Sequence, residues 1–231
     1  MSAKQFGMVI DLHKCVGCSG CDIACKCENN VPSEFSWSNH MIETTGKFPN
    51  TKYQYIPTLC NHCEDAPCVA TCPTTAMHKS EDGITLHSAN KCIGCRACQV
   101  ACPYGVIYFN DREPFDDYLS DQEALIPNCT STGAEDVDKT KAPALTYNPE
   151  SDGSYPGVRP KGIVEKCNFC SHRTKEGKDP WCVRSCPAGA RIFGDMNDPE
   201  SPPRKAIAKH RARVLKGEQG TRPNVFYIRS F

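Results

Sequence analysis

The stretch CIGCRACQVAC at residues 92–102 places four cysteines within eleven residues, and a proline follows. Three other groups of four cysteines begin and end in the same way, with two residues between the first pair and three between the last pair. The groups are Cys15, Cys18, Cys21 and Cys25; Cys60, Cys63, Cys68 and Cys72; Cys92, Cys95, Cys98 and Cys102; and Cys167, Cys170, Cys182 and Cys186. The cysteines therefore form an internal fourfold repeat, which uses sixteen of the eighteen in the chain.

Thiols at this spacing could form disulfides, bind zinc or bind iron–sulfur clusters. Disulfides suit secreted chains, and the N-terminal MSAKQFGMVIDL has neither an apolar signal region nor a twin arginine. Zinc sites usually present two Cys-x2-Cys pairs with a longer spacer, and only the fourth group resembles half of such a site. The run Cys-x2-Cys-x2-Cys-x3-Cys-Pro is instead typical of bacterial [4Fe–4S] ferredoxins. The sequence therefore predicts iron–sulfur clusters.

The last cysteine of each group should bind a different cluster from the first three. A tight loop can cover three corners of a cubane, whereas the fourth cysteine begins a segment that points away toward the neighbouring cluster. Groups two and three should therefore exchange their last cysteines, and groups one and four should do so across the chain. We predict four [4Fe–4S] clusters with these ligands: Cys15, Cys18, Cys21 and Cys186 (the Cys15 quartet); Cys25, Cys167, Cys170 and Cys182 (the Cys25 quartet); Cys72, Cys92, Cys95 and Cys98 (the Cys72 quartet); and Cys60, Cys63, Cys68 and Cys102 (the Cys60 quartet).

This pairing predicts an α+β fold of two ferredoxin-like dicluster units, with the second inserted in the first. The first unit would comprise 1–58 and 161–198, and the second 59–110. Short helices should run from the last cysteines of each group toward the strand that follows. The strands are expected at 7–12, 105–109 and 190–194, with a hairpin at 76–87.

The remaining segments are polar or terminal. Residues 111–160 are predicted to be an insertion, either solvated or lying against a partner subunit, and 29–58 a smaller one. Residues 199–231 should form a C-terminal helix and tail. The helix is expected at 201–217, between a serine with prolines and a glycine, and 225–231 should pack as an edge strand.

The composition narrows the class of protein. Hydrophobic residues make up only 39 % of the 231, cysteines included, so metal centres are expected to support a modest core. Acidic and basic residues balance at 27 each, which gives no indication of nucleic-acid binding. No apolar run approaches the roughly 20 residues of a membrane span. We find no flavin or nucleotide motif and no nucleophile–base arrangement, so a self-sufficient enzyme is disfavoured and no catalytic residue is assigned.

The four groups in order, including CNHCEDAPC and CIGCRACQVACPYGV, resemble the four-cluster iron–sulfur subunits of molybdopterin oxidoreductases of the dimethyl-sulfoxide-reductase type. The stretches YIPTLCNHCEDAPC, WSNHMIETTGKFP and VFYIRSF are similar to the small subunit of respiratory arsenate reductase. The small subunit of respiratory arsenite oxidase is a close rival, and those of polysulfide, thiosulfate or dimethyl sulfoxide reductases are alternatives. The resemblance implies a non-catalytic electron-transfer subunit.

The same resemblance implies partners and a location. A large molybdopterin catalytic subunit would complete a heterodimer, and a membrane quinol subunit or a cytochrome would be the redox partner. The catalytic subunit's twin-arginine signal would carry both chains into the periplasm, although this chain's own N-terminus would leave it in the cytoplasm. Family order would place the Cys15 quartet next to the catalytic subunit and the Cys60 quartet at the far end.

Charges near the cysteines suggest relative reduction potentials. Lysines precede the first cysteines of groups one, three and four, whereas Leu59 precedes group two, and the loop of group two carries Glu64 and Asp65. Cations favour the more negative, reduced cluster, so the Cys60 quartet is expected to have the lowest potential. The lysines are Lys14, Lys91 and Lys166.

Three other residues invite smaller expectations. Cys27 is expected to be a buried, inert thiol, and no role is assigned to Cys129. His62, within CNHC, is expected at the surface or beside the ligands rather than as a ligand, because its group already supplies enough cysteines.

Overall fold

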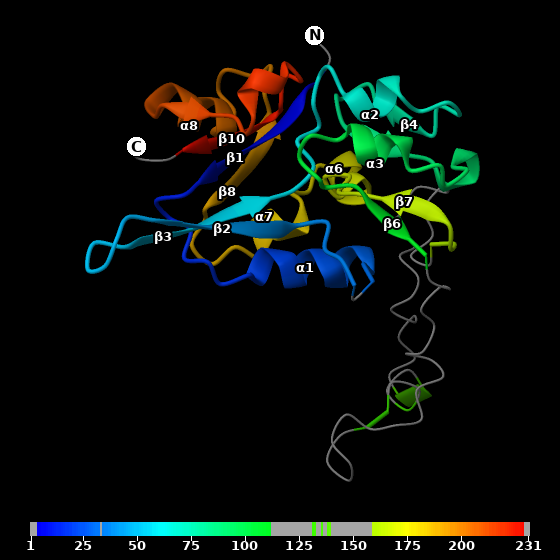
Figure 1. Ribbon diagram of the computed structural model, residues 1–231, viewed down its shortest axis with the longest axis horizontal. Coiled ribbons are helices and arrows are strands. Elements are labelled where there is room, and N and C mark those ends of the chain that lie inside the picture. The colour runs from blue at the N-terminus through cyan, green and yellow to red at the C-terminus, as the bar shows by residue number, and fades with distance from the viewer. Residues whose placement is uncertain are drawn as a thin grey trace.

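The computed structural model describes residues 4–32, 34–111, 131, 132, 135, 138, 139 and 159–228. It has an α+β architecture of short helices and strands, as predicted (Figure 1). The helices are α1 (Gly20–Asn29), α2 (Pro67–Ala70), η1 (Ala89–Lys91), α3 (Ala97–Ala101), α6 (Ser171–Lys175), α7 (Trp181–Arg184), α8 (Pro202–Lys209) and η2 (Gly217–Gln219). The strands are β1 (Phe6–Asp11), β2 (Asn39–Thr45), β3 (Lys52–Thr58), β4 (Met77–Lys79), β5 (Thr85–His87), β6 (Tyr108–Asn110), β7 (Ile163–Glu165), β8 (Arg191–Asp195), β9 (Ala212–Arg213) and β10 (Val225–Ile228).

The largest sheet has four strands in the order β8-β1-β10-β9. Strand β1 precedes the first cysteine group and pairs antiparallel with β8, which follows the fourth. Strand β10 lies parallel to β1 on its other side and pairs antiparallel with β9. The C-terminal strand is therefore internal to the sheet, and its prediction as an edge strand was wrong. Its side chains explain the difference, because Val225, Tyr227 and Ile228 are all buried.

Two small antiparallel pairs lie beside the second and third cysteine groups. Strands β4 and β5 form the hairpin predicted at 76–87, with Gly83 at a φ of +80° in the turn. Strand β6, after the third group, pairs with β7, which precedes the fourth. The two strands on either side of the segment between β6 and β7 therefore lie next to each other. Most of the insertion predicted at 111–160, with Cys129, lies outside the described residues.

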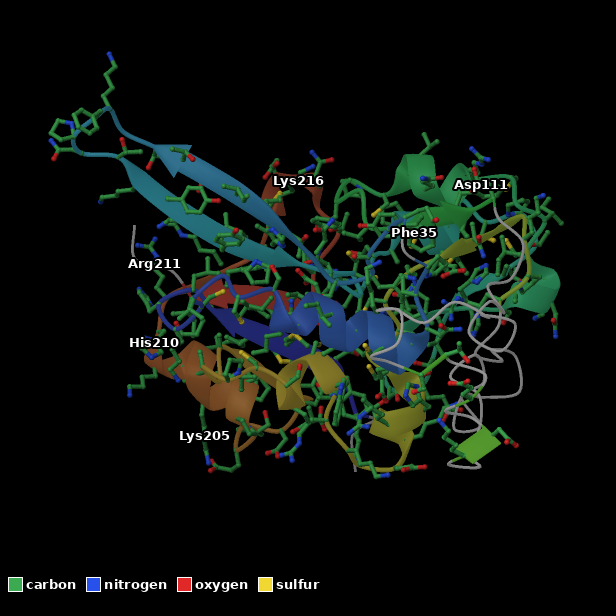
Figure 2. All side chains as sticks on the ribbon, turned by 90° about the horizontal axis from the view of Figure 1, so that it is seen from below. Phe35, Asp111, Lys205, His210, Arg211 and Lys216 are labelled. Atoms are coloured by element: carbon green, nitrogen blue, oxygen red, sulfur yellow. The ribbon has the colours of Figure 1, made fainter. Side chains whose placement is uncertain are left out.

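Residues 39–58 form a regular hairpin, β2–β3, rather than a polar insertion. The hairpin extends away from the body of the molecule (Figure 2). Large apolar side chains are exposed along it, including Ile42, Tyr53 and Phe48. Because neither face of most of the hairpin is covered, its sequence lacks the contrast between buried and exposed positions that identifies a strand. The alternation of polar and aromatic residues at the start of KYQYIPT was the available signal for a strand.

Short helices carry the third cysteine of every group, but α2, α3 and α7 end before the last cysteine instead of running toward the next strand. Helix α1 is longer and includes the last cysteine of its group. Helices α2, α3 and α7 have four or five residues, and a proline directly follows the last cysteine of each of their groups. A residue before proline is pushed out of the helical region, so the helix ends early. The first group has Lys26 at that position instead of proline, and α1 continues past it to Asn29, with a total length of ten residues.

Helix α8 begins where the sequence predicted and ends eight residues before the predicted end. Ser201 precedes it and Pro202 occupies its first turn, a position where the missing N–H of proline costs nothing. The helix stops at Lys209, and His210 is extended. Figure 2 shows His210 and Arg211 where the chain leaves the helix. Gly217 opens a separate 3-10 turn, so the glycine used to predict the end of α8 belongs to another element.

Candidate metal centres

The structure brings the four cysteines of each predicted quartet together. Three cavities are lined by complete quartets, namely the Cys15 quartet, the Cys25 quartet and the Cys60 quartet. In the Cys72 quartet, the other three cysteines lie close enough to Cys98 to raise the pKa of its thiol, although burial is the larger cause. Each quartet includes the exchanged cysteine, which comes from a different sequence group. The described cysteines are all free of disulfides.

Glycines in left-handed conformations bend the loops that carry the first cysteines. Gly17 has a φ of +67° and Gly94 a φ of +68°. A Cβ at Gly17 would lie 2.5 Å from the Tyr55 ring, and one at Gly94 would lie 2.2 Å from the carbonyl oxygen of Gly162. Both loops therefore require glycine for conformation and for space.

Backbone N–H groups point at several of the sulfurs. The sulfur of a first cysteine accepts a hydrogen bond from the backbone N–H two residues later in the sequence. The sulfur of a last cysteine accepts one from the backbone N–H four or five residues later. The donor–acceptor pairs are Gly94 to Cys92 (3.4 Å), Phe169 to Cys167 (3.4 Å), Met77 to Cys72 (3.4 Å) and Ala190 to Cys186 (3.3 Å). Hydrogen bonds of this kind stabilise thiolates and influence cluster potentials. The repeat is thus present in the backbone geometry as well as in the sequence.

Burial makes several of these thiols poor acids without a metal. It raises the pKa of Cys68 to about 12 and those of Cys21 and Cys98 to about 11. The pKa of Cys25 is raised well above its ordinary value for the same reason, with neighbouring cysteines adding to the effect. Such thiols are protonated at neutral pH unless a metal displaces the proton. The quartets therefore suit metal ligation.

A buried arginine tests whether a cluster fits this environment. The Nη2 atom of Arg191 donates to Cys21 Sγ at 3.2 Å, while its Nε and Nη1 are buried and find no acceptor within the described ranges. An iron–sulfur cluster brings sulfide sulfurs that can accept such hydrogen bonds. Within the same ranges no three His, Cys, Asp or Glu side chains are close enough to hold a single metal ion. A cubane needs its four ligands farther apart, one on each iron, so the residues fit a cluster.

Comparisons with known proteins agree with this chemistry. The 4Fe-4S dicluster domain family matches residues 51–117 and 157–196. The chain is 51 % identical over 228 residues to the arsenate respiratory reductase iron–sulfur subunit ArrB of Shewanella sp. strain ANA-3, covering 98 % of this chain and 97 % of that protein. The protein belongs to the iron–sulfur subunits of molybdopterin oxidoreductases.

Relatives in other reductases widen the family. A selenate reductase subunit of Mesobacillus selenatarsenatis is 40 % identical over 224 residues, covering 97 % of this chain and 72 % of that protein. A polysulfide reductase chain of Wolinella succinogenes is 31 % identical over 229 residues, covering 98 % and 95 %. This iron–sulfur subunit therefore has an electron-transfer function and uses [4Fe–4S] clusters. No described helix is long and apolar enough to cross a membrane.

Contacts between quartets define their order in the iron–sulfur subunit. Cys21 of the Cys15 quartet lies near Cys182 of the Cys25 quartet. Cys167 of the Cys25 quartet lies near Cys60. Cys68 and Cys98 pack in one further apolar cluster, which joins the Cys60 and Cys72 quartets. The order is therefore Cys15, Cys25, Cys60 and Cys72.

The expectation that the Cys60 quartet lies at the far end was wrong, because the Cys72 quartet occupies that place. The exchange of last cysteines relates the two quartets within one pair. It does not determine which quartet of one pair faces the other pair, because that depends on packing between distant segments.

The two terminal quartets are the more accessible ones. Cys18 and Cys95 are exposed, whereas all four cysteines of the Cys25 quartet are buried. Exposed apolar side chains flank each accessible cysteine: Val16 is 71 % exposed beside Cys18, and Ile93 is 67 % exposed beside Cys95. The two ends of the row are therefore open to solvent, while the interior is shielded from water.

The charges around the Cys60 quartet differ from the sequence-based expectation. Lys166 is buried, and its Nζ donates to the carbonyl oxygens of Thr85 and Cys167, the latter at 2.9 Å. Its charge acts on Cys68 and opposes the burial effect on that thiol's pKa. Lys79 Nζ donates to the Cys63 carbonyl oxygen at 2.9 Å.

The acidic residues near this quartet are already paired. Glu64 and Asp65 are exposed and form ion pairs with Arg222, at 2.9 Å and 2.5 Å. The argument for the lowest potential at the Cys60 quartet was therefore wrong in its premise, because one buried and one half-buried ammonium group lie close to it and its acidic neighbours are paired. Lys14, by contrast, has a side chain that is 55 % exposed, and Lys91 is also exposed.

One further expectation is corrected, and another is narrowed to one of its alternatives. Cys27 is exposed rather than buried, because it faces outward on α1 two residues beyond Cys25. His62 is fully buried, its ring stacks on Phe169 with centroids 3.7 Å apart, and its Nδ1 accepts the backbone N–H of Thr85. His62 therefore lies beside the ligands, which is one of the two positions expected for it, and it supports the loop of the Cys60 quartet from within.

Proposed function

We propose that each quartet holds one [4Fe–4S] cluster, so that the subunit carries four, and that it passes electrons between a molybdopterin catalytic subunit and a respiratory redox partner. The observation that carries this proposal is the row of four complete quartets with accessible ends and a buried interior. When bound, the clusters supply one-electron transfer. The chain holds them by cysteine, donates N–H groups to the ligating sulfurs and excludes water from the inner pair.

The proposal includes the nested arrangement of two dicluster units. Residues 1–58 and 161–198 would form the first unit and 59–110 the second, with 111–160 as an insertion and 199–231 as a C-terminal addition. The antiparallel pairing of β1 with β8 supports the first unit, because it joins the segments on either side of the second. The β6–β7 pair would then link the two units, since one strand comes from each.

The catalytic partner that we propose is that of a respiratory arsenate reductase. The 51 % identity to the arsenate respiratory reductase subunit extends over nearly the full length of both chains, which supports this assignment over more distant reductases. The Cys15 quartet would face the catalytic subunit, and the Cys72 quartet would face a membrane quinol subunit or a cytochrome. Export to the periplasm in a folded complex, directed by a twin-arginine signal on the partner, completes the proposal.

The test is to mix the reduced complex with candidate oxidants. The chain is purified anaerobically with its catalytic partner, reduced, and mixed with arsenate while the visible absorbance of the clusters is recorded. Reoxidation within the time of one turnover is the expected result. If arsenate does not reoxidise the clusters but selenate, tetrathionate or polysulfide does so rapidly, the proposed substrate is wrong and the electron-transfer role stands. Cell fractionation of the natural host then tests the periplasmic location.

A further inference from the structure

Arg191 lies between the first two quartets and is almost completely buried, with 3 % of its surface exposed. Its Nη2 donates to Cys21 Sγ at 3.2 Å and to Ser38 Oγ at 2.8 Å. Its positive charge also acts on Cys182, which belongs to the Cys25 quartet. One guanidinium therefore contacts a sulfur of the Cys15 quartet and lies within electrostatic range of a cysteine of the Cys25 quartet.

The sheet fixes the position of this side chain. Arg191 is the first residue of β8 and lies opposite Ile10 in the antiparallel pairing with β1. The preceding residue, Ala190, donates its N–H to Cys186 Sγ at 3.3 Å. The backbone that holds Arg191 is thus tied both to the core strand and to a cysteine of the Cys15 quartet.

The guanidinium is incompletely satisfied by protein groups. Nε and Nη1 have no acceptor within the part of the chain that the structure describes. Burying a charged donor without a partner is costly, so such a group is expected to meet an acceptor in the assembled protein. The space beside Arg191 is the cavity lined by the Cys15 quartet.

A buried carboxylate balances part of this charge. Asp22 lies beside Cys21, accepts a hydrogen bond from Ser38 at 2.9 Å and lies 3.0 Å from His40 Nδ1. Because Asp22 follows Cys21 directly, its negative charge acts mainly on the Cys15 quartet. The effect of Arg191 is therefore partly offset at the Cys15 quartet.

We propose that Arg191 sets the reduction potentials of the two clusters on either side of it, raising both, and that Asp22 opposes it at the Cys15 quartet. The physical reason is that reduction adds negative charge to a cluster, which a buried cation and N–H donors to sulfur stabilise. This inference rests on the proposed cluster ligation. It makes Arg191 a positioning and potential-setting residue shared by the first two carriers.

The test is a potentiometric EPR titration of the complete complex with R191Q, R191K, D22N and R184Q. R191Q should shift the reduction equilibrium of both flanking clusters toward the oxidised state by at least tenfold, which is about 59 mV for a one-electron couple. R191K keeps the positive charge, so both flanking clusters should retain reduction potentials close to those of the wild type. D22N should move the cluster of the Cys15 quartet in the opposite direction. R184Q is the matched control, since Arg184 is exposed on α7 two residues after Cys182, and it should shift neither cluster.

Unchanged potentials in R191Q, or an equal shift in R184Q, would overturn the inference. If R191Q fails to assemble clusters, D22N decides, because it keeps Arg191, and the absence of an upward shift at the Cys15 quartet would then refute the inference. Failure of the proposed ligation is a different result, since the wild-type chain itself would then lack one of the four cluster signals.

Discussion

Replacing Lys166 with methionine should lower the reduction potentials of the clusters at the Cys60 and Cys25 quartets. The ammonium is buried and held at the boundary between these quartets by the carbonyl oxygens of Thr85 and Cys167. Two unit charges roughly 6 Å apart at an effective dielectric constant of about 20 interact by about 2.8 kcal/mol. That energy corresponds to roughly 120 mV for a one-electron couple. Methionine has similar length and no charge, so the loss should approach this value.

The assay is redox titration of the full complex, monitored by EPR, with iron content measured on the same samples. K14M is the matched control, because Lys14 also precedes the first cysteine of its group but has an exposed side chain. For an exposed charge at the same distance from a cluster, the water-like dielectric constant reduces the expected shift in reduction potential to about 30 mV or less. Equal shifts in K14M and K166M, or no shift in K166M with full iron content, would refute the argument that burial of the charge decides the potential.

Three further predictions concern the loops, the exposed thiol and the metal. G17A should destabilise the Cys15 quartet by more than the roughly 1–2 kcal/mol that an alanine costs in a left-handed conformation, because its Cβ would also clash with Tyr55. G189A is the control, since Gly189 has a similar φ and open space around it. Urea titration of the cluster signal compares the two variants, and equal midpoints would contradict the clash. C27S should remove one thiol that reacts with iodoacetamide in the holoprotein without changing iron content; a loss of iron would show that Cys27 is a ligand. Iron removal should be accompanied by proton uptake and favoured at lower pH, because burial raises the pKa of Cys68 to about 12 without metal. Chelation whose heat does not depend on the ionisation enthalpy of the buffer would contradict this.

The cysteine quartets show what the sequence alone can predict. Spacing and the proline after Cys72, Cys102 and Cys186 were sufficient to predict which cysteines approach one another. The geometry of each loop and helix is local, and once groups two and three were paired, only groups one and four remained to pair with each other. The hairpin at 76–87 followed from a turn and alternation in the same way. These features depend on short-range geometry, so the linear pattern contains them.

Several of the errors concern contacts between distant segments. The burial of Lys166 depends on β5 passing over it, and the internal position of β10 depends on β9 covering its outer edge. The order of the quartets depends on Cys60 packing near Cys167, more than one hundred residues away. Residue type and spacing are the same whether such contacts form or not, which is why the three lysines preceding cysteine groups could not be told apart from the sequence.

The most direct test of the central claim is quantification of iron, acid-labile sulfide and zinc in the anaerobically purified protein, together with Mössbauer spectroscopy. Four cysteine quartets predict about sixteen irons and about sixteen sulfides per chain, all in [4Fe–4S] clusters, and no stoichiometric zinc. Roughly half that iron, or zinc in its place, would contradict the claim that every quartet holds a cluster.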